Sequence, residues 1–354
     1  MAETARVIAL VGFVLIAVCA SSLLFSLFGL SPLVGLASLF LGGFGSRGAL
    51  AATVGGMVPL LIMAVGLSVP FTARVWNIGG QGQFVIGSIM ATWMGLELSK
   101  SAPPSLVILF ALFASFLGGA LWLVPPILMR IYRGINEVIT TLMMNFVAVF
   151  LLDWLITGPM EGSQAIALNE PSSAPLPGYL MLPTLVRGTN IGLGLVLALL
   201  LAVGFFFMMR YTRLGFELRL IGHGVEAARY AGVSIERDIL IASLISGGIA
   251  GVAGMVQIYG AQGVLLPQVF SDITTSYGYV GIPVALIASL NPIGIILSAF
   301  FFSGILTGAY GIELTYDIPI DVVTALYGIV MFIAPLGFHI TLTRRKSRVQ
   351  RDGK

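Results

Sequence analysis

Apolar residues follow one another in long runs along this chain, and polar residues gather in the stretches between the runs. Several runs reach about 20 residues, the length that an α-helix needs to cross the hydrocarbon core of a bilayer. The pattern predicts an all-α polytopic membrane protein with about ten transmembrane helices. Their approximate ranges are 7–29, 52–71, 83–98, 104–125, 138–158, 189–209, 239–259, 276–290, 292–310 and 318–338.

The composition agrees with this pattern and narrows the function classes. Hydrophobic residues make up 58% of the chain and charged residues 9%, whereas soluble domains carry about a quarter charged residues. No soluble fold could bury so much apolar surface, and 354 residues leave no room for a separate soluble domain. We therefore expect residues 1–354 to form a single transmembrane domain.

The basic residues indicate an orientation. Of the 18 lysines and arginines, six lie in the tail 341–354 and five in the polar stretch 210–238. Cytoplasmic loops carry an excess of these residues. An N-terminus in the cytoplasm places fifteen of the 18 on that side and leaves only Arg47, Lys100 and Arg187 outside. Ten crossings return the chain to its starting side, so we expect both termini, the polar stretch and the basic tail to be cytoplasmic.

The opposite, outer face is expected to carry three longer loops, at 31–51, 159–189 and 311–321. Within the spans, Gly247 and Gly251 form a pair of small residues four positions apart. Small residues let helices approach closely in lipid, so this pair predicts tight helix packing.

Residue sets for catalysis or metal binding are scarce. His223 and His339 have no partner at metal-ligand spacing, and none of the three lysines follows a GxxxxG pattern. A phosphate-binding loop of that kind is therefore not predicted. We expect no catalytic residue, no metal site and no bound cofactor, and an intramembrane enzyme is disfavoured for lack of a catalytic set.

The segment Trp76–Phe84 is the first of three polar groups in or near the membrane. It holds Asn77, Gln81 and Gln83 among three glycines. Irregular backbone at membrane depth is tolerated only where protein or a water-filled path covers it. Two interpretations stay open: a plain interfacial turn, or a segment that lines or shapes a transport path.

The second polar group opens the predicted fifth span. Asn136 and Glu137 are expected to start and cap that helix, and Asn145 lies further along it. Asp153 lies further still, and a carboxylate inside a membrane is by default a candidate for function. The neighbouring Trp154 is typical of a membrane interface, which weakens that case.

The third polar group is the stretch 210–238 itself. Val225–Ala231 is expected to form a short helix that ends at Gly232, because glycine is favoured just after a helix. The stretch is longer than a plain connection requires. A short helix displayed at the membrane surface is suited to docking a cytoplasmic partner.

Four blocks in order along the chain resemble the signatures of one protein family. Residues 77–83, NIGGQGQ, resemble the family signature NIGxEGQ. Residues 134–141, GINEVITT, resemble the signature GxNEVIST. Residues 222–232, GHGVEAARYAG, resemble a cytoplasmic EAA-type loop. Residues 277–294, YGYVGIPVALIASLNPIG, resemble the signature GYGFDAIAVALLGxxNPxG. The chain is thus similar to the permease subunits of ABC importers, in the branch for ribose, simple sugars and nucleosides. The first two blocks are most similar to the nucleoside side of that branch.

The chain departs from the family pattern at three positions, Gln81, His223 and Pro283. Glutamate is usual at the first and asparagine at the second, and the proline interrupts an apolar run. The first departure concerns substrate chemistry near that turn, and the other two concern coupling or helix shape.

The resemblance implies an importer in the bacterial cytoplasmic (inner) membrane. Its pore would consist of this permease and a second permease subunit, a copy or a paralogue, each with about ten spans arranged as inverted repeats. An extracytoplasmic solute-binding protein would deliver the solute, and two cytoplasmic ABC ATPase subunits would drive alternating access. Membrane lipid surrounds such a protein, and no nucleic-acid partner is expected.

In such permeases the EAA-type loop forms a coupling helix that sits in a groove of the ATPase. The residues expected to couple to the ATPase are Gly222, Glu226, Ala227, Ala228, Arg229 and Gly232.

The residues expected along the substrate path are Trp76, Asn77, Gln81, Gln83, Asn145, Tyr277 and Tyr279. Amides and aromatic rings suit a neutral solute with a flat face and several hydroxyls, whereas a phosphate or carboxylate ligand would call for arginines. We therefore expect a neutral nucleoside or simple sugar as the substrate. The alternative is a secondary transporter driven by an ion gradient, which would usually hold charged residues at the midplane. Only Asp153 approaches that position.

Overall fold

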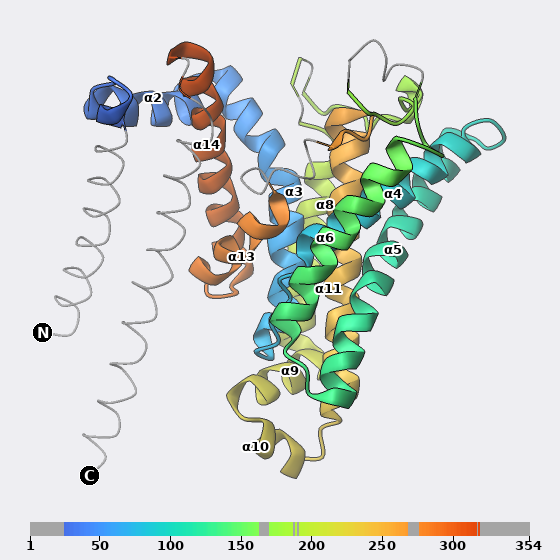
Figure 1. Cartoon of the computed structure of the whole chain (residues 1–354). Helices are drawn as coiled ribbons and strands as arrows, with labels where there is room; N and C mark the ends of the chain where they lie inside the picture. Colours follow the sequence, from blue (N-terminus) through green and yellow to red (C-terminus); the bar gives the residue numbers. More distant parts are fainter. Residues whose placement is uncertain are drawn as a thin grey trace, which may run out of the picture. The chain divides into compact units, whose positions relative to one another are not determined.

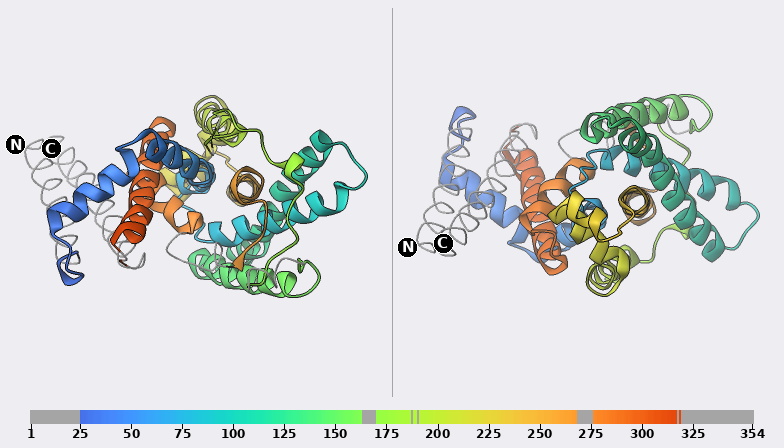
Figure 2. Two further views of the ribbon diagram at one scale, coloured as in Figure 1. Left: turned by 90° about the horizontal axis from the view of Figure 1, so that it is seen from above. Right: turned by 90° about the horizontal axis from the view of Figure 1, so that it is seen from below.

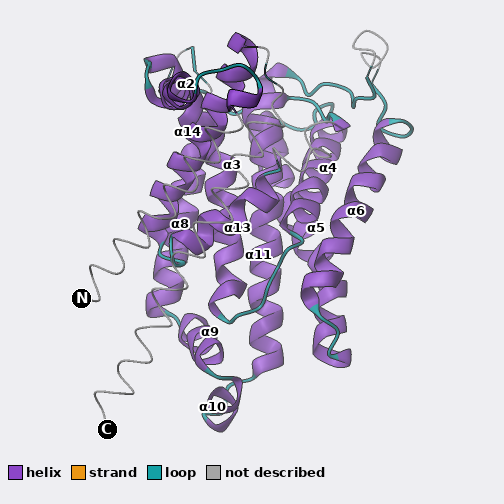
Figure 3. Cartoon of the chain, turned by 60° about the vertical axis from the view of Figure 1, so that its left-hand side comes forward, coloured by secondary structure: helices purple, strands orange, loops and turns teal. Residues whose placement is uncertain are grey.

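The computed structural model describes residues 25–162, 170–186, 188–189, 191–267, 276–316 and 318. Most of the predicted first span, nearly all of the predicted tenth span and the basic tail lie outside these residues, as do Arg187 and His339. Regular secondary structure in the described residues is helical (Figure 3). Isolated β-bridges join Glu161 to Ser173 and Thr184 to Gly192.

The chain divides into two compact units. One contains the residues up to Val54 and those from Phe300 onward, and the other is Gly55–Ala299. Helices α3 (Arg47–Thr72) and α14 (Pro292–Tyr316) contribute residues to both units.

In the first unit, helix α2 (Pro32–Phe44) packs with the parts of α3 and α14 that belong to this unit. Phe25, Leu39, Ala309 and Ile312 are buried together. A Cβ added at Gly43 would overlap with the carbonyl oxygen of Gly304, so α2 and α14 touch through their backbones.

The expectation of a loop across 31–51 is wrong, because α2 occupies most of it. The Ser31 side chain accepts a hydrogen bond from the Val34 backbone N–H at 3.4 Å, and Pro32 is the first helical residue. Serine before a helix and proline at its start are favoured there, so the signal was present in the sequence. Helix α14 likewise continues to Tyr316, into the loop expected over 311–321.

The second unit is a helical bundle with one short helix at its end (Figure 1). Besides its share of α3 and α14, its helices are α4 (Gly80–Leu98), α5 (Pro104–Arg133), α6 (Glu137–Ile156), α8 (Leu193–Tyr211), α9 (Arg213–His223), α10 (Val225–Tyr230), α11 (Ile235–Gln257) and α13 (Tyr277–Ile287). A π-helical turn, Ile258–Gln262, continues α11, and η1 (Gly178–Leu180) is a 3-10 turn.

Six helices in the described residues are long and apolar enough to cross a membrane. They are α3, α5, α6, α8, α14, and α11 with its continuation to Gln262. The protein is therefore an all-helical, multi-pass membrane protein. Helices α4 and α13 match two further predicted segments but fall short in hydropathy or length.

Helix α11 packs against α4 and α5 at the centre of the second unit, and Figure 2 shows it nearly end-on. A Cβ added at Gly87 of α4 would overlap with the carbonyl oxygen of Gly251, and one at Gly119 of α5 with that of Gly247. Only glycine lets the three backbones come this close. The tight packing predicted for Gly247 and Gly251 is confirmed.

The two ends of α11 carry different structures. Helices α9 and α10 lie at the N-terminal end of α11 (Figure 1). At its other end the backbone N–H groups of Leu176 and Leu182 donate to the carbonyl oxygens of Gly263 and Tyr259, each at 2.7 Å. The segment 170–186 is therefore hydrogen-bonded to the C-terminal end of α11 and its continuation, opposite α10.

Candidate functional site

The backbone between α3 and α4 is irregular and is stabilised by a buried pair of amides. Asn77 and Gln83 bond to each other twice, each Nδ2 or Nε2 donating to the partner's side-chain oxygen at 2.9 Å. Asn77 also donates to Ser246 Oγ of α11 at 3.1 Å, and its Oδ1 accepts from the Gly79 backbone N–H at 3.0 Å. Both amides are almost fully buried, and these bonds satisfy their buried polar atoms.

Asn145 of α6 supports the start of α4 from a neighbouring helix. The first N–H groups of a helix have no partner inside it, and Gly79, which precedes α4, offers no side-chain cap. Asn145 Oδ1 accepts from the Gly82 N–H at 2.8 Å. Its Nδ2 donates to the Ile78 carbonyl and to the Tyr279 hydroxyl, each at 3.0 Å. One amide therefore links α6, α4 and α13.

Gln81 supports the start of α13 in the same way. Ser276, which precedes that helix, makes no side-chain cap, and Gln81 Oε1 accepts from the Gly278 N–H at 3.0 Å. A Cβ added at Gly278 would overlap with the Gln81 backbone. The beginnings of α4 and α13 thus meet directly, with the missing caps supplied by side chains of other helices.

This meeting point lies well within the length of α6, a helix that is long and apolar enough to span a membrane. Asn145 is eight residues into α6, or about 12 Å along that helix at 1.5 Å per residue. Two helix starts and an irregular loop at such a depth require protein cover. Asn77, Gln81 and Asn145 supply hydrogen bonds for that backbone. Gln83 bonds to the side chain of Asn77. These contacts favour the structural interpretation of the segment.

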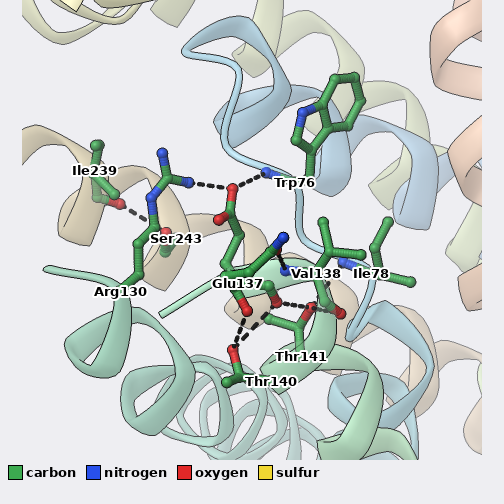
Figure 4. Close-up of polar contacts among 10 residues, drawn as sticks. Trp76, Ile78, Arg130, Glu137, Val138, Thr140, Thr141, Ile239 and Ser243 are labelled. Carbon is green, nitrogen blue, oxygen red and sulfur yellow. Dashed lines mark hydrogen bonds and ion pairs between the residues drawn. The ribbon is translucent and has the colours of Figure 1, made fainter. Parts of the chain in front are cut away.

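Figure 4 shows a second set of contacts at the start of α6. The Glu137 carboxylate pairs with Arg130 at the end of α5 and accepts a hydrogen bond from the Trp76 backbone N–H at 3.2 Å. Thr141 Oγ1 accepts from the Ile78 N–H at 3.2 Å. Asn136 Oδ1 accepts from the Val138 N–H at 2.9 Å, so the predicted cap of this helix is confirmed.

The aromatic residues of the predicted path are more accessible than the amides. Trp76 is 37% exposed and its ring lies 5.0 Å from the Phe71 ring. Tyr277 and Tyr279 are partly buried, and the Tyr277 ring lies 5.7 Å from the Phe84 ring. The tyrosines join the amides around the starts of α4 and α13, whereas Trp76 lies at the Glu137 contact.

The predicted coupling stretch contains two helices. Helix α9 was not expected. The residue that marks its start in the sequence is Thr212, whose Oγ1 caps the helix by accepting a hydrogen bond from the Gly215 N–H at 3.2 Å. Helix α10 matches the expected short helix within one residue, and Gly232 follows it with φ +79°, a conformation that glycine adopts readily. Gly222 packs against the end of α3, because a Cβ there would overlap with the Thr72 carbonyl oxygen.

Four of the six predicted coupling residues are exposed, whereas Gly222 and Ala228 are buried. Glu226, Ala227, Arg229 and Gly232 are exposed, and Tyr230 beside them is 92% exposed. Ala228 is fully buried against its own chain. It holds α10 in place and offers no surface to a partner.

Sequence reasoning missed the charged contacts behind α10. Glu217 of α9 and Asp238 of α11 are both buried, and Arg213 Nε donates to Glu217 Oε1 at 2.6 Å. This hydrogen bond and the charge of Glu217 raise the pKa of Arg213, which stays protonated. The spacing of Arg213 and Glu217, four residues apart on a helix, was a usable signal. Asp153, in contrast, is exposed.

Comparison with known proteins gives one family and several similar permeases. Residues 49–335 match the family described as branched-chain amino acid transport system permease components. The chain is 31% identical to the glucose ABC transporter permease TsgB13 of Haloferax volcanii, over 77% of this chain and 72% of that protein. It is 27% identical to the guanosine ABC transporter permease NupP of Bacillus subtilis, over 94% of both chains. It is 28% identical to the nucleoside ABC transporter permease NupB of Lactococcus lactis, over 91% of this chain and 88% of that one.

Proposed function

The chain belongs to the family of branched-chain amino acid transport system permease components, and on this premise we propose that it carries a neutral nucleoside across the bacterial cytoplasmic membrane. It is the membrane-spanning permease subunit of an ABC importer and not an enzyme. ABC permeases of this kind work with ATPase subunits and a solute-binding protein. The substrate, the second permease subunit and the transport path belong to the proposal.

The substrate proposal rests on how much of this chain aligns with permeases for nucleosides. The guanosine permease aligns over 94% of both chains, and the nucleoside permease over about as much. A simple sugar is the second candidate, because the glucose permease is 31% identical over a shorter part of the chain. Both substrates are uncharged and rich in hydroxyls, which fits a meeting point built from amides and tyrosines.

We place the substrate path beside the meeting point of α4, α6 and α13. The partly exposed Tyr277, Tyr279 and Trp76 are suited to contact the solute, since aromatic rings offer flat apolar faces. The buried Asn77, Gln81, Gln83 and Asn145 would shape the wall by holding the two helix starts in position. The proposal thus divides the seven predicted residues into those that line the path and those that support it.

The stretch 210–238 is proposed as the cytoplasmic coupling loop, with α10 as its contact helix. An aromatic side chain as exposed as Tyr230 is typical of an interface anchor. Ala227, Glu226 and Arg229 share its exposure, whereas Gly222 and Ala228 would act by fixing α10 to the permease. This proposal sets both termini in the cytoplasm and keeps about ten spans in inverted repeats.

A second permease subunit, a copy or a paralogue, would complete the pore. Closure of the ATPase dimer on ATP would move the two coupling helices together, and the permease halves would rock around the path between them. The ATPase pair supplies the free energy, so the permease itself needs no charged residue at the midplane.

Competition for uptake tests the substrate class. Cells that carry the whole transporter, with the permease deleted as a control, would take up labelled guanosine in the presence of unlabelled competitors. We expect neutral nucleosides to block uptake, and nucleotides and sugar phosphates to leave it unchanged. Permease-dependent uptake of labelled glucose, with none of labelled guanosine, would transfer the assignment to the sugar candidate. Permease-dependent uptake of a labelled nucleotide, with none of guanosine or glucose, would refute the neutral-solute proposal.

A further inference from the structure

A cavity of about 330 Å³ lies at one end of α8, and its lining includes none of the seven predicted path residues and none of the six predicted coupling residues. Its walls come from α8, from α9 and from the connection between α13 and α14. The lining residues are Phe205, Phe206, Met209, Arg210, Arg219, Leu290 and Pro292. Five apolar residues and two arginines therefore share one hollow.

The two arginines give this cavity an unbalanced positive charge. Neither Arg210 nor Arg219 pairs with a carboxylate among the described residues. Arg219 donates one hydrogen bond to the Met209 carbonyl oxygen, which uses one of the five N–H groups of a guanidinium. Arg210 lies over the Tyr211 ring, 5.9 Å from its centroid. A guanidinium matches the oxygens of a phosphate group geometrically, so the cavity is complementary to such an anion.

The position of the cavity selects among the sources of phosphate. Helix α8 is long and apolar enough to cross a membrane, and Arg210 is its last residue but one. The cavity therefore lies where a span meets the lipid headgroups. Just before it, Val203, Phe206 and Phe207 expose apolar side chains on α8. Acyl chains of the bilayer cover such side chains, so a phospholipid bound at the cavity would continue directly along them.

The backbone on the other side of the cavity is unusual. Ser289 and Leu290 both adopt left-handed conformations, with φ of +52° and +59°. This conformation is energetically unfavourable for residues with a Cβ. It persists only where the surrounding structure stabilises it, often beside ligand sites. Here it turns the chain between α13 and α14 and brings Leu290 into the cavity wall.

We propose that this cavity binds the phosphate group of an anionic phospholipid from the leaflet on the α10 side. Arg210 and Arg219 contact the phosphate oxygens, and the acyl chains run along the exposed apolar side chains of α8. Basic pockets between transmembrane helices are suited to lipid headgroups of this kind. Because α8 leads directly into α9 and α10, the lipid is held next to the proposed coupling loop.

Photolabelling of the full-length protein, purified with its co-purifying subunits and reconstituted in vesicles, tests this site. The probes are photoactivatable phosphatidylglycerol and photoactivatable phosphatidylcholine at equal trace amounts, with labelled peptides mapped by mass spectrometry. The variants are Arg210→Gln and the double variant Arg210→Gln with Arg219→Gln, in which glutamine retains a donor for the Met209 carbonyl. The matched control is Arg133→Gln, an exposed cation outside the cavity.

We expect phosphatidylglycerol to label residues 203–219 far more than phosphatidylcholine does. Each arginine removed should lower this labelling by about fivefold, because one basic residue near an anionic membrane contributes that factor in affinity. Arg133→Gln should label like the wild type. Arg210→Gln leaves the Arg219 contact with Met209 intact, so it provides the test if the double variant does not fold.

Three outcomes would overturn the proposal. Equal labelling by the two lipids, or labelling unchanged by the arginine variants, would mean that the cavity is an ordinary apolar hollow. Loss of phosphatidylglycerol labelling on addition of millimolar inorganic phosphate, at constant ionic strength, would assign the site to a soluble phosphate compound. None of these outcomes depends on which solute is transported.

Discussion

Replacing Asn145 with leucine keeps a side chain that branches at Cγ and removes the polar groups that link α6, α4 and α13. The variant loses the bond to the Gly82 N–H and the bonds to the Ile78 carbonyl and the Tyr279 hydroxyl. Gly82 is buried, so water cannot replace its partner. If Asn145 supports the wall of the path, the variant should lose stability first and transport as a consequence.

The size of the loss can be bracketed from the three bonds. Hydrogen bonds between membrane helices contribute about 0.6 kcal/mol each on average, which sets a lower value of about 2 kcal/mol. An orphaned buried N–H or carbonyl group costs about 1–3 kcal/mol, which raises the upper value to about 5 kcal/mol. At about 2–4 °C per kcal/mol, the melting temperature should fall by at least about 4 °C.

Thermal melting of the detergent-purified permease at one fixed scan rate measures this shift. Met143→Leu is the matched control, because Met143 is an exposed apolar residue on the same helix. It should melt like the wild type. An unchanged melting temperature for Asn145→Leu together with a raised KM for uptake would refute the supporting role and indicate direct contact with the solute.

Two further predictions follow from burial at α10 and from glycine contacts. Ala227→Arg should lower ATPase co-purification by at least about tenfold at normal expression, because a guanidinium on the exposed face of α10 would prevent close contact with the partner. Ala228→Arg should lower expression, because Ala228 is buried. Normal ATPase binding by the first variant would argue against α10 as the contact. Gly87→Val should destabilise the bundle by about 3 kcal/mol or more, since the added atoms overlap with Gly251 backbone, while Gly204→Val, with open space around it, should express and melt normally. Equal stability of these two glycine variants would contradict the close packing of α4 on α11.

Local signals predicted much of the fold. Apolar runs located the long helices that the structure describes. Asn136 and Gly232 marked a helix start and a helix end, because caps act over a few residues. The helix after Ser31 was overlooked despite a cap and a proline, since its glycine and serine content suggested a loop. Such errors arise where composition and capping signals disagree.

The site depends on contacts that the sequence does not display. Asn77 bonds to Ser246, which is 169 residues away, and Gln81 bonds to Gly278, which is 197 residues away. An amide in an apolar run can face a solute or cap a distant helix, and only the packing of the helices decides between them. Ala228 shows the same limit, because an alanine in a short helix carries no sign of which face it occupies.

ATP-driven uptake in proteoliposomes tests the central claim most directly. The permease would be reconstituted with its co-purifying ATPase subunits and its solute-binding protein, with ATP on the ATPase side and a labelled neutral nucleoside on the other. We expect uptake that requires ATP and the binding protein and that persists when ion gradients are collapsed. Uptake that follows an imposed proton or sodium gradient without ATP would contradict the account and favour the secondary transporter.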